Sequence, residues 1–178
     1  FTASLPIAAG TTIFAQDIIR AIYGEAYAPA SQALVWLIWV IVPSFFTYIL
    51  GLLLVSSNNE KISMYITGSA AVANIIANLI LIPRYGFVGA AIATIITEVL
   101  LVIIDYIVVS RRVHTINVRS LVKPILAAGV MTAALLLLPR TILILDILIG
   151  GVIYAGVLLL VRGATKQDVQ IIKNIFKR

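Results

Sequence analysis

The chain has 178 residues, of which 62% are hydrophobic and only 11% are charged, and its formal net charge is +6. Soluble domains contain about 45–50% apolar and about 25% charged residues, so this composition excludes an ordinary water-soluble domain and indicates a membrane protein. We assign the positive charge to cytoplasmic loops rather than to contact with nucleic acid. The absence of cysteine and the presence of one histidine exclude disulfides, thiolate nucleophiles and cysteine- or histidine-rich metal sites.

Runs of about 20 mostly apolar residues, the length that crosses a bilayer as a helix, recur along the sequence. They predict an all-α fold, a polytopic transmembrane helix bundle of about six spans over residues 1–161. In chain order the expected spans cover residues 1–22, 30–55, 62–82, 87–109, 121–138 and 142–161. From Arg162 the composition changes, and residues 162–178 are expected to form a cytoplasmic amphipathic tail helix in the headgroup region.

The second expected span contains a proline near its middle. Pro43 removes a backbone donor and clashes with the preceding turn, so we expect it to kink this helix. The kink has two interpretations: a hinge for gating, or an ordinary bend of the kind that many membrane helices contain.

The sequence predicts that the third and fourth expected spans form a transmembrane hairpin with polar groups facing inward. Asn74 and Asn78 share one helix face with Thr67 in the first of these spans. A short turn over residues 83–86 follows. The next span opens with two rows of small residues that allow helix backbones to approach closely in lipid. These rows are Gly86, Ala90 and Thr94, and Gly89, Ala93 and Thr97.

Four polar residues are the candidate substrate or ion pathway. Glu98 lies mid-span, where a carboxylate costs roughly 2.5–3.5 kcal/mol to insert; it is either a coupling or substrate-binding group, or a packing group bonded to a neighbouring helix. Asp105 follows on the same face, where we expect a solvated helix-end residue near the cytoplasm, or a second acid lining a cytoplasm-facing vestibule with Glu98. Asn74 and Asn78 either contact sugar hydroxyls or tie helices together.

The basic residues are distributed unevenly between the loops and predict an orientation. With the C-terminus in the cytoplasm, ten of the 13 basic residues lie inside, as the positive-inside rule requires. The inside residues are Lys61, Arg111, Arg112, Arg119, Lys123, Arg162, Lys166, Lys173, Lys177 and Arg178; the outside residues are Arg20, Arg84 and Arg140.

Two strings in the sequence carry a family resemblance. One is Asn74-x3-Asn78-x2-Leu81-Ile82-Pro83-x-Tyr85-Gly86-x2-Gly89-Ala90-Ala91-x-Ala93-Thr94-x2-Thr97-Glu98, and the other is Leu5-Pro6 followed by Ile22-Tyr23-Gly24-x2-Tyr27-x2-Ala30. They resemble the C-terminal portion of the polysaccharide-biosynthesis flippases, a family of the multidrug/oligosaccharidyl-lipid/polysaccharide (MOP) exporter superfamily. The resemblance covers most of residues 5–98; beyond Asp105 only the helix pattern is similar.

The resemblance implies a fold and a function. Such flippases have about fourteen helices in two six-helix lobes plus a final pair, and they move lipid-diphosphate-linked sugars across the cytoplasmic membrane by alternating access. This chain would supply the second lobe's later helices and the final pair, and it would need the N-terminal lobe of the same protein as a partner. The expected partners are membrane lipid, a lipid-linked glycan and either Na⁺ or H⁺, with no cofactor and no nucleic acid.

Two alternative functions remain open. One is a drug or metabolite exporter of the same superfamily that is coupled to Na⁺ or H⁺ through Glu98. The other is a membrane-embedded enzyme of glycan assembly such as a polymerase, which should have long external loops with acidic or histidine residues, whereas the loops expected here are short. The sequence contains no nucleophile–base–orienter set and no phosphate-cradling glycine loop, so we expect no enzyme activity.

Overall fold

The structure, a computed structural model, describes residues 2–113, 121–138 and 142–161. Within these ranges the regular elements are all helices, and three helical segments are long and apolar enough to cross a membrane. They are Glu25–Ser56, Glu60–Arg112 and Leu143–Leu160, and a shorter apolar helix covers Val122–Leu137. The predicted fold class, an all-α membrane helix bundle, is therefore confirmed.

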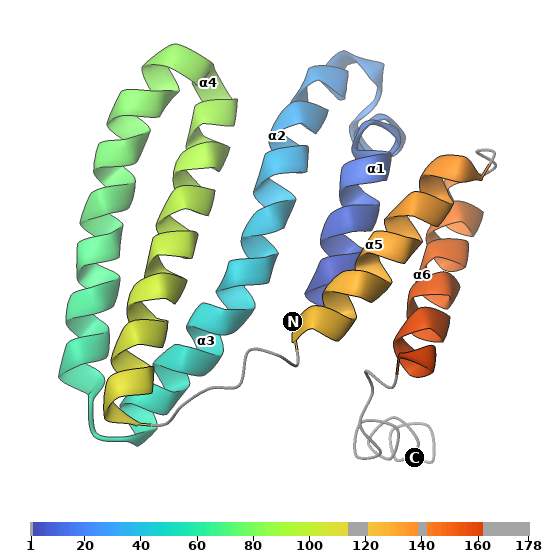
Figure 1. Cartoon of the computed structure of the whole chain (residues 1–178). Helices are drawn as coiled ribbons and strands as arrows, with labels where there is room; N and C mark the ends of the chain where they lie inside the picture. The colour runs from blue at the N-terminus through green and yellow to red at the C-terminus, as the bar shows by residue number, and fades with distance from the viewer. Residues whose placement is uncertain (1, 114–120, 139–141, 162–178) are drawn as a thin grey trace, which may run out of the picture. The chain divides into compact units, whose positions relative to one another are not determined.

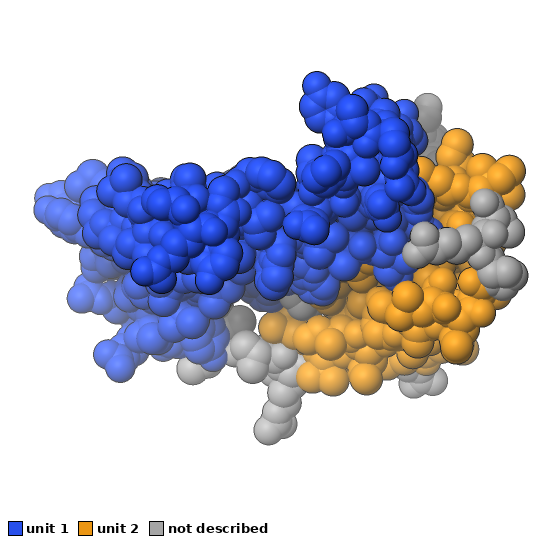
Figure 2. Space-filling model, turned by 90° about the horizontal axis from the view of Figure 1, so that it is seen from above, with its two compact units in different colours: residues 1, 11–116 blue, residues 2–10, 117–178 orange. Residues whose placement is uncertain are grey.

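The chain divides into two compact units, which Figure 2 shows in different colours. One unit holds residues 11–116 and the other holds residues 2–10 and 117–178. Helix α1 (Ser4–Tyr23) supplies its first turns to the second unit and its remainder to the first. Polar residues lower the hydropathy of α1, which is not among the three long apolar segments. A span over residues 1–22 therefore stays a prediction.

A helical segment with three changes of helix type follows α1 in the first unit. In chain order it comprises the 3-10 helix η1 (Glu25–Ala30), α2 (Ser31–Leu37), the 3-10 turn η2 (Ile38–Val40) and α3 (Ile41–Ser56). Pro43 lies in the first turn of α3 and has no N–H to donate to the carbonyl of Trp39, four residues earlier. This missing bond accounts for the 3-10 turn just before Pro43, so the helix is interrupted where the sequence predicts a disturbance. A hinge at Pro43 stays a prediction.

Helix α4 (Glu60–Arg112) folds back on itself at Gly86, so that its two limbs run side by side (Figure 1). Gly86 has φ 57° and ψ −138°, a backbone conformation that glycine adopts far more readily than other residues. The limbs, residues 60–85 and 87–112, each have about 26 residues and reach about 39 Å, which is enough to cross a bilayer. The structure thus joins the third and fourth expected spans in one hairpin.

Helix α3 and the two limbs of α4 share an apolar core in the first unit. Its buried members are Leu50, Leu54, Ile66, Ala70, Leu101 and Val109. Ile62, near the start of α4, and Val113, just after its end, both pack against this core. The two ends of the hairpin therefore meet at the same end of the unit, close to the end of α3, as Figure 1 shows.

In the second unit, α5 (Val122–Leu137) packs against α6 (Leu143–Leu160). The contact is close at Gly150, where an added Cβ would lie 3.0 Å from Cδ1 of Leu135. The hydroxyl of Tyr154 donates a hydrogen bond of 2.5 Å to the backbone carbonyl of Thr2. The turn expected at residues 139–141 and the tail helix expected at residues 162–178 lie outside the described residues.

Candidate functional site

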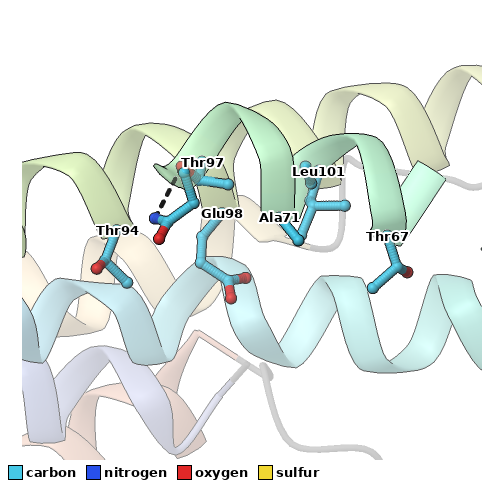
Figure 3. A pocket seen from close by; sticks show the side chains of 8 residues that line it. Thr67, Ala71, Thr94, Thr97, Glu98 and Leu101 are labelled. Atoms are coloured by element: carbon cyan, nitrogen blue, oxygen red, sulfur yellow. Dashed lines mark hydrogen bonds between the residues drawn. The ribbon is translucent and has the colours of Figure 1, made fainter. Parts of the chain in front are cut away.

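A cavity of about 300 Å³ opens between the two limbs of α4 (Figure 3). Its polar lining residues are Thr67, Asn74, Thr94, Thr97 and Glu98, and alanine and leucine side chains complete the wall. The cavity therefore offers hydroxyl and amide groups together with one carboxylate. An isolated polar group inside a membrane segment is costly, so five of them around one cavity mark this part of the hairpin as the candidate site.

A chain of hydrogen bonds crosses from one limb to the other beside the cavity. Nδ2 of Asn78 donates to both the backbone carbonyl and Oδ1 of Asn74, each at 2.9 Å. Nδ2 of Asn74 donates to Oγ1 of Thr97 at 3.1 Å, and the hydroxyl of Thr97 donates to the carbonyl of Ala93 at 2.8 Å. The three side chains are thus linked by a continuous series of hydrogen bonds. The bond from Asn74 to Thr97 fixes the register of the two limbs.

Glu98 extends from the second limb toward α3 (Figure 3). Its side chain is half-buried, and its Oε2 accepts a hydrogen bond from the hydroxyl of Thr47 at 3.4 Å. Hydrogen bonds between hydroxyl and carboxylate oxygens are usually 2.5–3.0 Å long, so this contact is weak. The carboxylate of Glu98 therefore retains the capacity to accept a stronger hydrogen bond or to bind a cation in the cavity.

Asp105 lies elsewhere, in the apolar core of the first unit. Its side chain is 4% exposed, and Leu101 and Val109, one turn away on either side, both belong to the core. The expectation of a solvated helix-end residue is therefore wrong. The physical reason is that positions four residues apart share a helix face, and this face of the second limb is the one that packs. Only Glu98 of the two acids lines the cavity.

The two asparagines occupy different positions. Asn74 lines the cavity and ties the limbs together, whereas Asn78 borders a separate, largely apolar hollow of about 290 Å³ together with Ile75, Leu79 and Pro83. Pro43 belongs to α3 and does not line the cavity. The structure thus brings Asn74, Asn78 and Glu98 into one neighbourhood and leaves Asp105 and Pro43 outside it.

Two residues of this site were not identified as partners from the sequence. The sequence predicts Thr97 as a small packing residue, whereas in the structure its hydroxyl also accepts the hydrogen bond from Asn74. The sequence does indicate this pairing, because Asn74 and Thr97 lie at nearly equal distances in sequence from the Gly86 bend and so come opposite each other in a hairpin. Thr47 had no such signal, because the packing of α3 against the hairpin depends on the tertiary fold.

In the comparison with protein-family models, the MatE family matches residues 1–80. The matched range covers α1 to α3 and most of the first limb of α4, so it includes Pro43, Asn74 and Asn78 and ends before Glu98. Neither a curated protein nor a solved structure matches the chain. Together with the apolar helices, the MatE match indicates a multi-pass membrane protein with a role in transport. Residues 1–80 are therefore similar to the MatE family, which belongs to the multidrug/oligosaccharidyl-lipid/polysaccharide exporter superfamily.

Proposed function

We propose that this chain forms part of a flippase that moves a lipid-linked oligosaccharide across the cytoplasmic membrane by alternating access. The chain would contribute one wall of the substrate pathway, and the N-terminal lobe of the same protein would contribute the other. The C-terminus would lie in the cytoplasm. The protein would act as a transporter and catalyse no covalent reaction.

The observation that carries this proposal is the polar wall of the α4 hairpin. The amide of Asn74 and the hydroxyls of Thr67 and Thr94 line the cavity beside the carboxylate of Glu98. Such neutral donors and acceptors match the hydroxyl groups of a sugar, which exchange hydrogen bonds with them during passage. The carboxylate of Glu98, whose contact with Thr47 is weak, does not match a purely apolar substrate, which would desolvate it and offer no hydrogen bond in return. The resemblance of residues 74–98 to the polysaccharide flippases supports the same substrate class.

The proposal also gives Glu98 a role in the cycle. A carboxylate on the cavity wall accepts hydrogen bonds from substrate hydroxyls or binds the coupling Na⁺ or H⁺. Its weak contact with Thr47, at 3.4 Å, leaves it free to exchange partners as the cavity opens and closes. Alternating access needs contacts of this kind, because a tight and permanent bond would hold one state.

The second candidate is an exporter of drugs or metabolites that is driven by Na⁺ or H⁺, and the same carboxylate favours it. In that case Glu98 would bind the ion and the substrate would be a smaller, more apolar molecule. A transport assay with both substrates separates the two candidates.

The test reconstitutes the complete gene product in liposomes and follows two transport reactions. One reaction is the appearance of a fluorescent lipid-linked oligosaccharide on the opposite leaflet, and the other is the uptake of a cationic dye under a Na⁺ or H⁺ gradient. We expect movement of the lipid-linked sugar. Dye uptake without any movement of the lipid-linked sugar would support the exporter and contradict the flippase.

A further inference from the structure

Three basic side chains gather at the open end of the α4 hairpin, opposite the Gly86 bend. The bond between Asn74 and Thr97 sets the register, and equal steps along the limbs from these two residues reach Glu60 and Arg111. The two ends of α4 lie beside each other in Figure 1. Lys61, Arg111 and Arg112 therefore share one end of the first unit.

The charges at this end are exposed and outnumber the nearby acid. Lys61, Arg111 and Arg112 are all exposed, and among the described residues α4 places one carboxylate, that of Glu60, beside them. The ion pair between Nε of Arg20 and Oε2 of Glu25, which are 2.8 Å apart, lies at the other end of the unit. The open end of the hairpin therefore carries a net positive charge that no described side chain neutralises.

Exposed apolar and aromatic side chains lie one turn inward from these cations. Met64 and Tyr65 follow Lys61 on the first limb and are 62% and 70% exposed, and Tyr106 and Ile107 precede Arg111 on the second limb and are 37% and 41% exposed. The surface thus changes from cationic to apolar over about 5–6 Å along the helices. A phospholipid complements this arrangement, because its anionic phosphate headgroup adjoins its apolar acyl chains.

We propose that the open end of the α4 hairpin binds the phosphate headgroups of anionic bilayer phospholipids. Lys61, Arg111 and Arg112 contact the headgroup, and the apolar side chains below them contact the acyl chains. The proposal depends on the membrane location of the chain and not on the identity of the transported substrate. Cations close to a negatively charged leaflet each increase binding by about fivefold.

The test places the complete gene product in nanodiscs that contain phosphatidylcholine and phosphatidylglycerol, with a spin label on one lipid at a time. The fraction of motionally restricted label gives the relative affinity of the protein for each lipid. We expect phosphatidylglycerol to be preferred by roughly tenfold at low salt, and we expect the preference to decrease at 0.5 M NaCl because salt screens exposed charges. No preference in the unmodified protein would overturn the proposal.

Variants then locate the site. Lys61→Gln combined with Arg111→Gln and Arg112→Gln should remove most of the preference, whereas Arg84→Gln, the matched change beside the Gly86 bend, should preserve it. The double variant Arg111→Lys, Arg112→Lys keeps the charge and should keep the preference. This variant shows that the loss in the triple variant results from the missing charge and not from misfolding. An equal loss in Arg84→Gln would contradict the proposed location. A polyprenyl diphosphate that fully displaces phosphatidylglycerol from the site would show that the site serves the transported lipid instead.

Discussion

Nδ2 of Asn74 donates a hydrogen bond to Oγ1 of Thr97 at 3.1 Å, and this bond joins the two limbs of α4 across 23 positions of sequence. Thr97 is able to accept it because the proton of its own hydroxyl is directed to the carbonyl of Ala93, at 2.8 Å. The register that results places Glu98, the next residue, on the cavity wall and toward α3. The position of the candidate site thus depends on this pair.

Replacing Thr97 by valine should weaken the hairpin. The variant keeps the shape of the side chain but removes the acceptor, so the amide of Asn74 loses its partner on the other limb. Interhelical hydrogen bonds of this kind contribute about 0.6–2 kcal/mol in membranes, and we expect a loss of that size in the free energy of unfolding in mixed detergent micelles. Thr94→Val is the matched control, because Thr94 donates to Ala90 within its own helix. Equal losses in the two variants would contradict the role of the pair.

Replacing Gly89 by alanine should disrupt the bend of α4. A Cβ at this position would lie 2.4 Å from the backbone carbonyl oxygen of Leu81, which is closer than real contacts allow. The limbs would have to separate, and overpacking of this kind typically costs about 1–3 kcal/mol. Gly68→Ala is the control in the same helix, because nothing lies within 4 Å of its added Cβ. We expect a lower melting temperature and yield for the Gly89 variant alone; unchanged values would contradict the close approach at the bend.

Replacing Asp105 by leucine should separate stability from function. A carboxyl group in the apolar core of the first unit is costly, so an apolar side chain of similar size should leave the free energy of unfolding unchanged or raise it by about 1–4 kcal/mol. Because Asp105 does not line the cavity, we expect transport to stay at the level of the unmodified protein. Asp105→Asn serves as the control, because it keeps the shape and removes the charge. A large loss of stability in the leucine variant would show that Asp105 has a structural polar contact.

Single cysteines should establish the orientation of the hairpin. The chain contains no cysteine, so an introduced thiol gives an unambiguous label in this part of the protein. Arg84→Cys lies beside the Gly86 bend and should react with an impermeant maleimide added outside intact cells. Arg112→Cys lies at the open end and should react only after the membrane is made permeable. The reverse pattern would contradict the orientation inferred from the distribution of basic residues.

The hairpin itself was predictable from local sequence. Pro83 and Gly86 separate two apolar runs, and the small residues that follow allow the close packing that the structure has at Gly89. The inward orientation of the Asn74 side chain was also predictable, because its spacing from Thr67 follows the period of a helix. In the structure both residues line the cavity. These features depend on covalent neighbours and helical geometry, which the sequence contains directly.

The environment of the acidic residues was less predictable. Glu98 and Asp105 lie seven positions apart on one face of a helix, so the helical period alone predicts the same environment for both residues. The structure separates them because Asp105 is buried between Leu101 and Val109, two residues of the core that α3 shares, whereas Glu98 lines a cavity. That difference depends on side chains from another helix, such as Leu50 and Leu54, whose position the local pattern does not contain.

Export by a Glu98→Gln variant of the complete gene product tests the central proposal most directly. Glu60→Gln is the matched control, because Glu60 is exposed at the start of α4 and does not line the cavity. With equal amounts of protein in the membrane, we expect glycan export to fall at least about tenfold in the Glu98 variant, which corresponds to about 1.4 kcal/mol, and to be unchanged in the control. Normal export by Glu98→Gln at a normal protein level would show that this carboxylate only packs, and it would contradict the proposed pathway.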